Sequence, residues 1–575
     1  MWQRVRAHGA ELLCGGILMV MALQTLAVIA RKSITNDEVG IIPAGYYHLV
    51  AGNFQISMDH PPLTKMVAAL PMLLIQPNEP SLESAKGEES LLSIRAHEEF
   101  LTNQGNFWIA NREYFHAISY WSRVPMIALM LLLGILIFVY TRQVFGVRAA
   151  LISVGLFSIE PNVLAHGRTA LNDLPAALAY LLFFFSIYRY LQIPNFRRAL
   201  LLGLVTGLAI VTKFSLIIAA PIFVCVGIFS VWRAPRWNEE RTRVTAWFGL
   251  ASLAALLTIN SVYYFQGDSG VAASQFRWLS SIFSGELLNL ALKGVRALSL
   301  IVPSYLLAGV DAVLARNRFG HPASLLGMHS TLGWWYYFPV AFALKTTIPF
   351  LFISIAALCW SIWRLTTKKE TILLYLLIPF FIYVAMALTS HIDIGIRHLL
   401  PVFPFLFILG GAFLARLTLQ TRAAKVLIIL VAILLGWSGV EAVRAFPNHM
   451  SYMNELAWQH PHWYYLSDSN VEWGDDVPEL ANYLRQHGET KVRAALLGGW
   501  ATLPYYGVEY IDMQVSPDVQ LTKTRYVAIG ASFLNGSTVS IAPPGRSSAD
   551  FFDEYRNRVP EAVFGNSIYL FREHE

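Results

Sequence analysis

Charged side chains are scarce in this sequence of 575 residues: aspartate, glutamate, lysine and arginine together make up 14%, whereas soluble domains carry roughly 25%. Apolar residues make up 55% and gather in long runs. This balance excludes a soluble globular protein and predicts an integral membrane protein. The formal net charge of +6 is expected to come from cytoplasmic loops, so we expect no nucleic-acid partner.

Cysteine is almost absent as well. The three cysteines, Cys14, Cys225 and Cys359, each fall inside an apolar run. A disulfide framework or a cysteine metal site needs cysteines at paired or ligand spacings, so neither is expected. We interpret the three as small core residues.

The apolar runs are long enough to cross a membrane, which takes about 20 mostly apolar residues per helix. We predict eleven spans, near residues 10–31, 117–141, 149–166, 174–191, 198–213, 214–232, 244–264, 337–363, 371–389, 397–416 and 424–443. The fifth and sixth are halves of one run interrupted by Thr212-Lys213, so one bent hairpin or a re-entrant pair also fits.

The placement of lysine and arginine in the short connections predicts the orientation of the spans. Basic residues fall in alternate connections, for example Arg142 and Arg148 after the second span and Lys368 after the eighth. We therefore expect a multi-pass protein of the inner (cytoplasmic) membrane with a cytoplasmic N-terminus and an extracytoplasmic C-terminus. Residues 1–30 also fit a cleaved signal peptide, which would leave ten spans in the same orientation.

This orientation puts all large polar segments on the outer face. We expect residues 1–445 to form the transmembrane domain, with outer loops at 32–116 and 265–336. The first of these loops mixes aromatic, acidic and apolar residues, which predicts interfacial helices.

The C-terminal residues 446–575 differ in composition from the rest. Residues 478–486 have helical periodicity, with Gly488 as a stop signal. Three segments indicate strands, namely 491–497, 526–533 and 567–571. We expect a small α/β domain on the outer face.

Seven phrases along the chain point to one family. They are Asn36-Asp37-Glu38; Asp59-His60-Pro61-Pro62-Leu63-Thr64-Lys65; Ala165-His166-Gly167-Arg168 followed by Asn172-Asp173-Leu174-Pro175; Leu208 to Ser215; Gly333-Trp334-Trp335-Tyr336-Tyr337-Phe338-Pro339 followed by Lys345; Asp393 to Pro401; and Asp468-Ser469-Asn470 followed by Trp473-Gly474-Asp475-Asp476. In this order they resemble the bacterial relatives of dolichyl-phosphate-mannose protein mannosyltransferases. That family is a branch of the GT-C glycosyltransferases that also includes lipid A aminoarabinose transferases.

The resemblance implies a polytopic helical enzyme of the GT-C fold that needs no metal or other cofactor. It implies inverting transfer of one sugar from a polyprenyl-phosphate donor to a protein, lipid or polysaccharide acceptor at the outer face. Such a reaction needs a carboxylate to take the proton of the acceptor hydroxyl, and cations to stabilise the departing phosphate. The alternative is a lipid-linked sugar transporter or flippase, which commonly shows repeated halves with discontinuous helices; we find neither.

For the base, the resemblance assigns Asp37, with Glu38 holding its neighbours or the sugar. Asp173 carries the family's second functional carboxylate, which binds the acceptor or orients Arg168. Each aspartate could also have a purely structural role, as the cap of a helix N-terminus.

For the donor phosphate we favour Lys345, because an ammonium inside a span needs an anionic partner. Arg397 and His398 are expected to clamp the same phosphate, since arginine supplies paired donors. Arg123 and Lys65 are further candidates, and either could snorkel to the interface instead. We add three substrate-binding candidates, His60, Arg168 and Tyr337, while Lys213 is ambiguous because its side of the membrane depends on the uncertain hairpin.

The stretch 468–479 has carboxylates and an asparagine at intervals found in calcium loops. Gly474 comes one position late for the turn of such a loop, so calcium is only an alternative. We expect the stretch to dock the outer domain near the site or to contact the acceptor.

Overall fold

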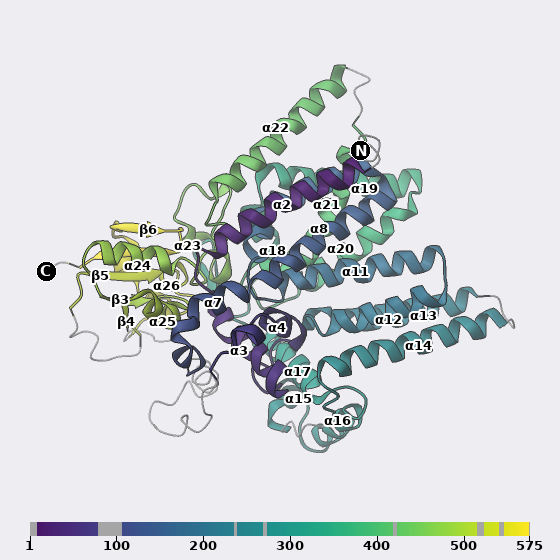
Figure 1. The fold of residues 1–575 in the computed structure, drawn as a ribbon, viewed down its shortest axis with the longest axis horizontal. Helices are drawn as coiled ribbons and strands as arrows, with labels where there is room; N and C mark the ends of the chain where they lie inside the picture. The colour runs from purple at the N-terminus through teal and green to yellow at the C-terminus, as the bar shows by residue number, and fades with distance from the viewer. Residues whose placement is uncertain are drawn as a thin grey trace.

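The computed structural model describes residues 8–78, 106–234, 239–267, 273–417, 422–514, 523–539 and 545–573. It consists of a bundle of long helices with a small sheet domain at one end (Figure 1). We call the end of the bundle that contacts this domain the domain end. Part of the predicted outer loop 32–116, residues 79–105, lies outside the described residues.

Eight helical stretches in the described ranges are long and apolar enough to cross a membrane. They are Gly9–Ile29, Arg112–Phe145, Asp173–Gln192, Phe214–Arg233, Glu239–Val262, Ile348–Lys368, Thr371–Leu388 and Ile396–Leu414. Their helices are α2 (Gly9–Ile29), α7 (Phe115–Trp121) with α8 (Val124–Phe145), α11 (Asp173–Gln192), α13 (Ala219–Arg233), α14 (Glu239–Val262), α19 (Ile348–Lys368), α20 (Leu374–Leu388) and α21 (Phe403–Leu414). The prediction of a polytopic helical membrane protein is confirmed.

The other predicted spans are also helical, but several of the eleven are interrupted. The predicted span 117–141 contains the end of α7 and most of α8, with a turn at Ser122 and Arg123 between them. The predicted span 149–166 is α9 (Val147–Ser158) and a separate turn of helix, α10 (Pro161–His166). The predicted span 337–363 is α18 (Tyr337–Lys345) and the start of α19, because Pro349 has no N–H to continue the helix. In its place, the side-chain amide of Asn162 donates to the carbonyl of Lys345 at 2.8 Å.

The doubtful run 198–232 is a pair of helices. α12 (Phe196–Ile210) and α13 lie beside α14 and reach away from the sheet domain (Figure 1). α12 and α14 approach closely, because a Cβ at Gly203 would lie 2.1 Å from the carbonyl oxygen of Ala251. Small residues permit such contacts between membrane helices. The turn between α12 and α13, which contains Lys213, lies at the domain end.

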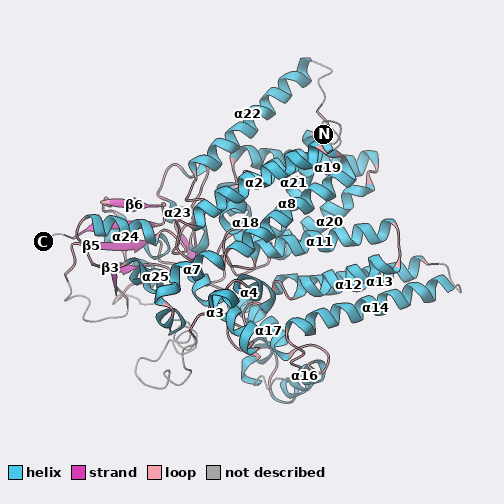
Figure 2. Cartoon of the chain, viewed as in Figure 1, coloured by secondary structure: helices cyan, strands magenta, loops and turns pink. Residues whose placement is uncertain are grey.

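Shorter helices cover the domain end. α3 (Asn36–Ala51) and α4 (Pro62–Ala69) pack together there. α15 (Arg277–Ile282), α16 (Gly285–Leu298) and α17 (Ser304–Phe319) lie below them in Figure 1, and Figure 2 shows this region as helical. The carboxylate of Glu38 accepts from the backbone N–H of Thr35 at 2.7 Å and so caps the start of α3. Remaining elements of the described residues are α5 (Met72–Ile75), α22 (Arg422–Arg444) and the hairpin β1 (Ala323–Leu325) with β2 (Met328–Ser330).

The C-terminal domain contains a five-stranded sheet of order β4-β3-β5-β7-β6. The strands are β3 (Lys491–Ala495), β4 (Glu509–Asp512), β5 (Tyr526–Gly530), β6 (Ala562–Phe564) and β7 (Ile568–Arg572). β3 runs parallel to β4 and β5, whereas β7 runs antiparallel to β5 and β6. The helices are α23 (His462–Tyr465), α24 (Val477–Gln486), α25 (Gly499–Thr502), α26 (Ala531–Leu534) and α27 (Asp553–Arg556).

The predicted helix and the three predicted strands of this domain are therefore present. The second strand ends at Gly530, earlier than predicted, because α26 begins there. The prediction omitted β4 and β6, which are only four and three residues long.

Candidate active site

Arg397 lies at the centre of an ionic cluster at the domain end. Its Nη1 donates to Oδ2 of Asp37 at 2.9 Å and lies 3.7 Å from Oδ2 of Asp173. Its Nη2 lies 3.9 Å from Oδ1 of Asp468. The guanidinium also lies 4.1 Å from the ring centroid of Trp473, in cation–π geometry. One buried cation therefore holds three carboxylates from three separate parts of the chain.

Lys213 completes this cluster. Its ammonium donates to Oδ1 of Asp173, the first residue of α11, so its side of the membrane is that of Asp37 and Arg397. Because Asp173 bonds to Lys213 and faces Arg397, the expectation that it orients Arg168 is wrong. The sequence alone did not decide on which side of the membrane Lys213 lies, and the structure places it in this cluster. The signal that marks Lys213 in the sequence is a charge inside an otherwise apolar run.

The neighbouring acids Asp37 and Glu38 have different surroundings. The Asp37 side chain is 27% exposed, and its Oδ1 has only a long 3.5 Å contact, from the amide of Asn36. Glu38 is fully buried and accepts from the backbone N–H of Ala170 at 2.7 Å besides that of Thr35. Asp37 is thus the one of the pair with an oxygen available to a substrate, while Glu38 holds its neighbours together.

Arg123 is the main partner of Glu38. Its Nε and Nη2 donate to the two carboxylate oxygens at 2.8 and 2.6 Å. Its Nη1 donates to the carbonyl of Lys32 at 3.1 Å, and Nη2 also donates to that of Ser33. Burial alone would raise the pKa of Glu38, but Arg123 and the two backbone donors bring it below its usual value. The buried guanidinium of Arg123 ties the chain before α3 to α8.

Lys345 is enclosed in a similar way. Its ammonium donates to the backbone carbonyls of Met450 and Asn470 at 2.6 and 2.5 Å. In the part of the chain that the structure describes, no carboxylate lies within salt-bridge distance of it, contrary to the anionic partner that we expected. The side chain joins α18 to the segment that precedes the sheet domain.

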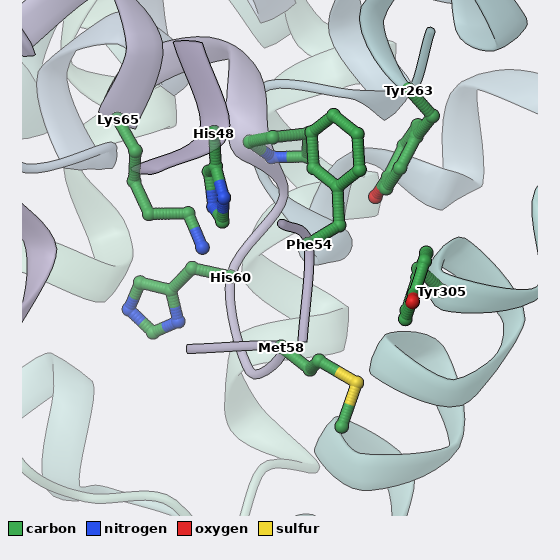
Figure 3. Close-up of a pocket in the computed structure, with 8 residues that line it drawn as sticks. His48, Phe54, Met58, His60, Lys65, Tyr263 and Tyr305 are labelled. Atoms are coloured by element: carbon green, nitrogen blue, oxygen red, sulfur yellow. The ribbon is translucent and has the colours of Figure 1, made fainter. Parts of the chain in front are cut away.

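A small pocket opens beside α3 and α4 and contains two of the predicted site residues, Lys65 and His60 (Figure 3). Its lining consists of His48, Phe54, Met58, His60, Pro62, Lys65, Tyr263 and Tyr305. The ammonium of Lys65 donates to the carbonyl of Ser57 at 2.6 Å. Burial lowers the pKa of Lys65 to about 7, although Asp59 acts in the opposite direction.

His398 lies between this pocket and the ionic cluster. It follows Arg397 on the 3₁₀ helix η6 (Ile396–Val402) and is half-buried. Its electrostatic neighbours include His60, which lines the pocket, and Lys213 and Asp173 of the cluster. His398 therefore connects the pocket with the cluster, in which two cations, Arg397 and Lys213, face three carboxylates.

Arg168 and Tyr337 lie behind the cluster. Nη2 of Arg168 donates to Oδ2 of Asp475 at 2.7 Å, and both side chains are buried. The hydroxyl of the buried Tyr337 accepts from the amide of Asn470 at 2.8 Å. Both residues hold the segment 468–476 against the bundle and do not line the pocket.

The segment 468–479 docks the sheet domain, as expected. Its carboxylates have partners within the protein. Asp475 pairs with Arg168, Asp476 and Glu479 share Lys32, and Glu472 accepts from the backbone N–H groups of Leu497 and Ser532 at 2.7 and 2.8 Å. In the described ranges, no group of three or more His, Cys, Asp or Glu side chains is arranged to hold a metal ion. The acids of this segment serve as bridges between elements.

Comparison with known proteins adds a family match to this geometry. Residues 115–264 match the family model described as dolichyl-phosphate-mannose-protein mannosyltransferase. No curated protein sequence matches the chain.

Several solved structures are similar over most of their length. ArnT from Cupriavidus metallidurans in the apo state is 12% identical, with a TM-score of 0.48 over 98% of each chain. The same protein bound to undecaprenyl phosphate gives 0.47 over 98% of each chain, at 12% identity. The oligosaccharyltransferase of Archaeoglobus fulgidus, with zinc and sulfate, is 12% identical with a TM-score of 0.44 over 90% of this chain and 68% of that one.

Proposed function

We propose, starting from the match of residues 115–264 to the family model described as dolichyl-phosphate-mannose-protein mannosyltransferase, that this chain is an inverting glycosyltransferase. It moves one sugar from a polyprenyl-phosphate carrier to an acceptor hydroxyl on the outer side of the cytoplasmic membrane. The observation that carries the proposal is Arg397, buried at the domain end with Asp37 at 2.9 Å and Asp173 at 3.7 Å. An acid and a cation are thereby fixed beside one another where a lipid headgroup can reach them.

Asp37 is the proposed base. Arg397 engages Oδ2 and leaves Oδ1 directed at the acceptor, whose hydroxyl proton it takes as the oxygen attacks the anomeric carbon. The bond between the anomeric carbon and the phosphate oxygen breaks on the opposite face of the sugar, which inverts the configuration. Asp173, held by Lys213, sets the position of Arg397 from the other side.

The departing phosphate is proposed to face Lys65, His60, His398 and Arg397. These four residues line or adjoin the pocket and can bring positive charge or N–H donors to oxygen atoms that gain charge during departure. Lys65 and His60 line the pocket, whereas Lys345 and Arg123 do not. Lys345 instead donates to two backbone carbonyls, and Arg123 is paired with Glu38. The aromatic wall of Phe54, Tyr263 and Tyr305 suits the first isoprene units of the carrier. The reaction is proposed to need no metal.

The experiment that tests this function is mass spectrometry of lipids that copurify with the protein from its native membrane. The lipid found is then incubated with the purified protein and with membrane extracts that supply acceptors. We expect a polyprenyl-phosphate sugar that disappears on incubation, with release of polyprenyl phosphate. A lipid that binds but is only moved between leaflets of a vesicle, without loss of its sugar, would favour a flippase instead.

A further inference from the structure

His48 is a buried histidine of the pocket to which the proposed reaction assigns no role. It lies on α3, is 1% exposed and lines the pocket with Lys65 and His60. Figure 3 shows the His48 ring beside the ammonium of Lys65, with His60 across the same space. Its position is far from the proposed base, because eleven residues of helix separate it from Asp37, roughly 16 Å along the axis.

The hydrogen bonds of His48 fix which ring nitrogen carries the proton. Nδ1 lies 2.7 Å from the backbone carbonyl oxygen of Asn53. Because a carbonyl can only accept, Nδ1 must be the donor. In a neutral ring, Nε2 then has no proton and is an acceptor. This Nε2 is buried and has no partner among the described residues.

The surroundings keep the ring neutral. Burial lowers the pKa of His48 to about 2, and the charge of Lys65 acts in the same direction. The other titratable groups on the elements around it are Asp59 and His60 in the loop before α4, Tyr263 after α14 and Tyr305 on α17. No described carboxylate lies within salt-bridge distance of His48.

We propose, on the basis of the donor pocket described above, that His48 recognises the protonated oxygen of a phosphate monoester through Nε2. A buried polar group without a partner is unfavourable, and a ligand with a matching donor removes that cost. The unprotonated Nε2 of His48 is an acceptor, and the ammonium of Lys65 beside it is a donor with positive charge. Together they are complementary to a phosphate that has both a P–OH group and a negative oxygen. Lys65 binds the negative oxygen, and the P–OH donates to Nε2.

This chemistry distinguishes the released carrier from the sugar donor. The donor is a phosphodiester, which has a single negative charge and no P–OH. The released polyprenyl phosphate is a monoester with a second pKa of about 6, so a large fraction of its molecules has a P–OH group at pH 6. His48 therefore makes the pocket selective for the product of transfer, and product release becomes slower at acidic pH.

The test compares a short-chain polyprenyl phosphate with its methyl phosphodiester, as ligands of the purified full-length protein at pH 6 and pH 8. The quantity measured is the ratio of the two dissociation constants, and wild type and variants are compared at pH 6, where a large fraction of the monoester has the same single charge as the diester. His48→Phe keeps a ring against Phe54 but removes both nitrogens. His48→Gln places an amide oxygen near the position of Nε2 and is the matched variant.

In the wild type we expect the monoester to be preferred at pH 6, and the preference to fall at pH 8. In His48→Phe the preference at pH 6 should drop about tenfold, which is the size of one lost hydrogen bond of about 1.4 kcal/mol, while diester affinity stays the same. His48→Gln should retain most of the preference. Equal weakening of both ligands in both variants, or a wild type without preference, would overturn the inference.

Two further outcomes separate this inference from the function on which it depends. If neither lipid binds the wild type, while inorganic phosphate does, the pocket is an anion site unrelated to a lipid carrier and the proposed function fails with it. If both lipids bind the wild type and His48→Phe leaves the ratio unchanged, only the role of His48 is lost. Melting temperatures of the variants show whether each is folded.

Discussion

Replacing Arg397 with glutamine should abolish the organisation of the proposed active site. At an effective dielectric constant of about 20, a charge 3.7 Å from Asp173 and 3.9 Å from Asp468 gains about 4 kcal/mol from each, before any cost of desolvation. The hydrogen-bonded pair with Asp37 adds about 1.5–3 kcal/mol. Desolvation of a buried guanidinium offsets most of this sum. Measured losses on breaking a buried pair are about 3–5 kcal/mol.

The loss should appear in both stability and turnover. We expect a lower melting temperature in detergent and a fall in kcat/KM on the order of 10²–10³-fold, since each 1.36 kcal/mol lost from the transition state is about tenfold. Arg416→Gln is the matched control, because Arg416 is 43% exposed and pairs with Glu370 at 3.3 Å, where an ion pair contributes little. If Arg397→Gln retains kcat/KM within threefold of the control, the cluster is not the active site.

Three other predictions follow from particular contacts. Gly203→Ala should lower the melting temperature, because its Cβ would meet the carbonyl of Ala251 at 2.1 Å, whereas Gly249→Ala, with nothing within 4 Å, should not. Glu38→Gln should destabilise the protein by about 3–5 kcal/mol in a denaturation assay by leaving Arg123 without its buried partner, and a loss below about 1 kcal/mol would contradict this role. The pKa of Lys65 is lowered to about 7, so its charge is present below pH 7 and lost above it. Affinity for a polyprenyl phosphodiester should therefore fall from pH 6 to pH 8 in the wild type but not in Lys65→Met, and an identical pH profile in the two proteins would contradict it.

Local properties of the sequence were enough to predict the spans. A run of apolar residues has only one favourable environment, so α2, α11 and α14 fall where hydropathy places them. The breaks within predicted spans depend on single residues, such as Pro349. Pro349 was visible in the sequence, but it is tolerated in many membrane helices, so the separation of α18 from α19 was not predicted.

The pairing of distant residues could not be read from the sequence. Arg397 and Asp37 are 360 residues apart, and Arg168 and Asp475 are 307 apart. Family motifs identified Asp37, Asp173 and Arg397 as candidates, and the structure brings these three together. The motifs do not distinguish a cation that lines the site, such as Lys65, from one that joins two segments of the chain, such as Lys345. For this reason the sequence alone favours Lys345 over Lys65. That distinction depends on which carbonyl or carboxylate meets each ammonium.

If Asp37 is the base, its loss must slow consumption of the bound donor in a single turnover. The measurement loads wild type, Asp37→Asn and the control Asp553→Asn, whose aspartate pairs with Arg556 in the sheet domain, with the copurifying lipid and follows loss of its sugar after acceptor is added. We expect Asp37→Asn to bind the donor as tightly as the control but to consume it at least about 10³-fold more slowly, because the general base and its orienting contacts are lost. Consumption by Asp37→Asn at the rate of the control would contradict this assignment.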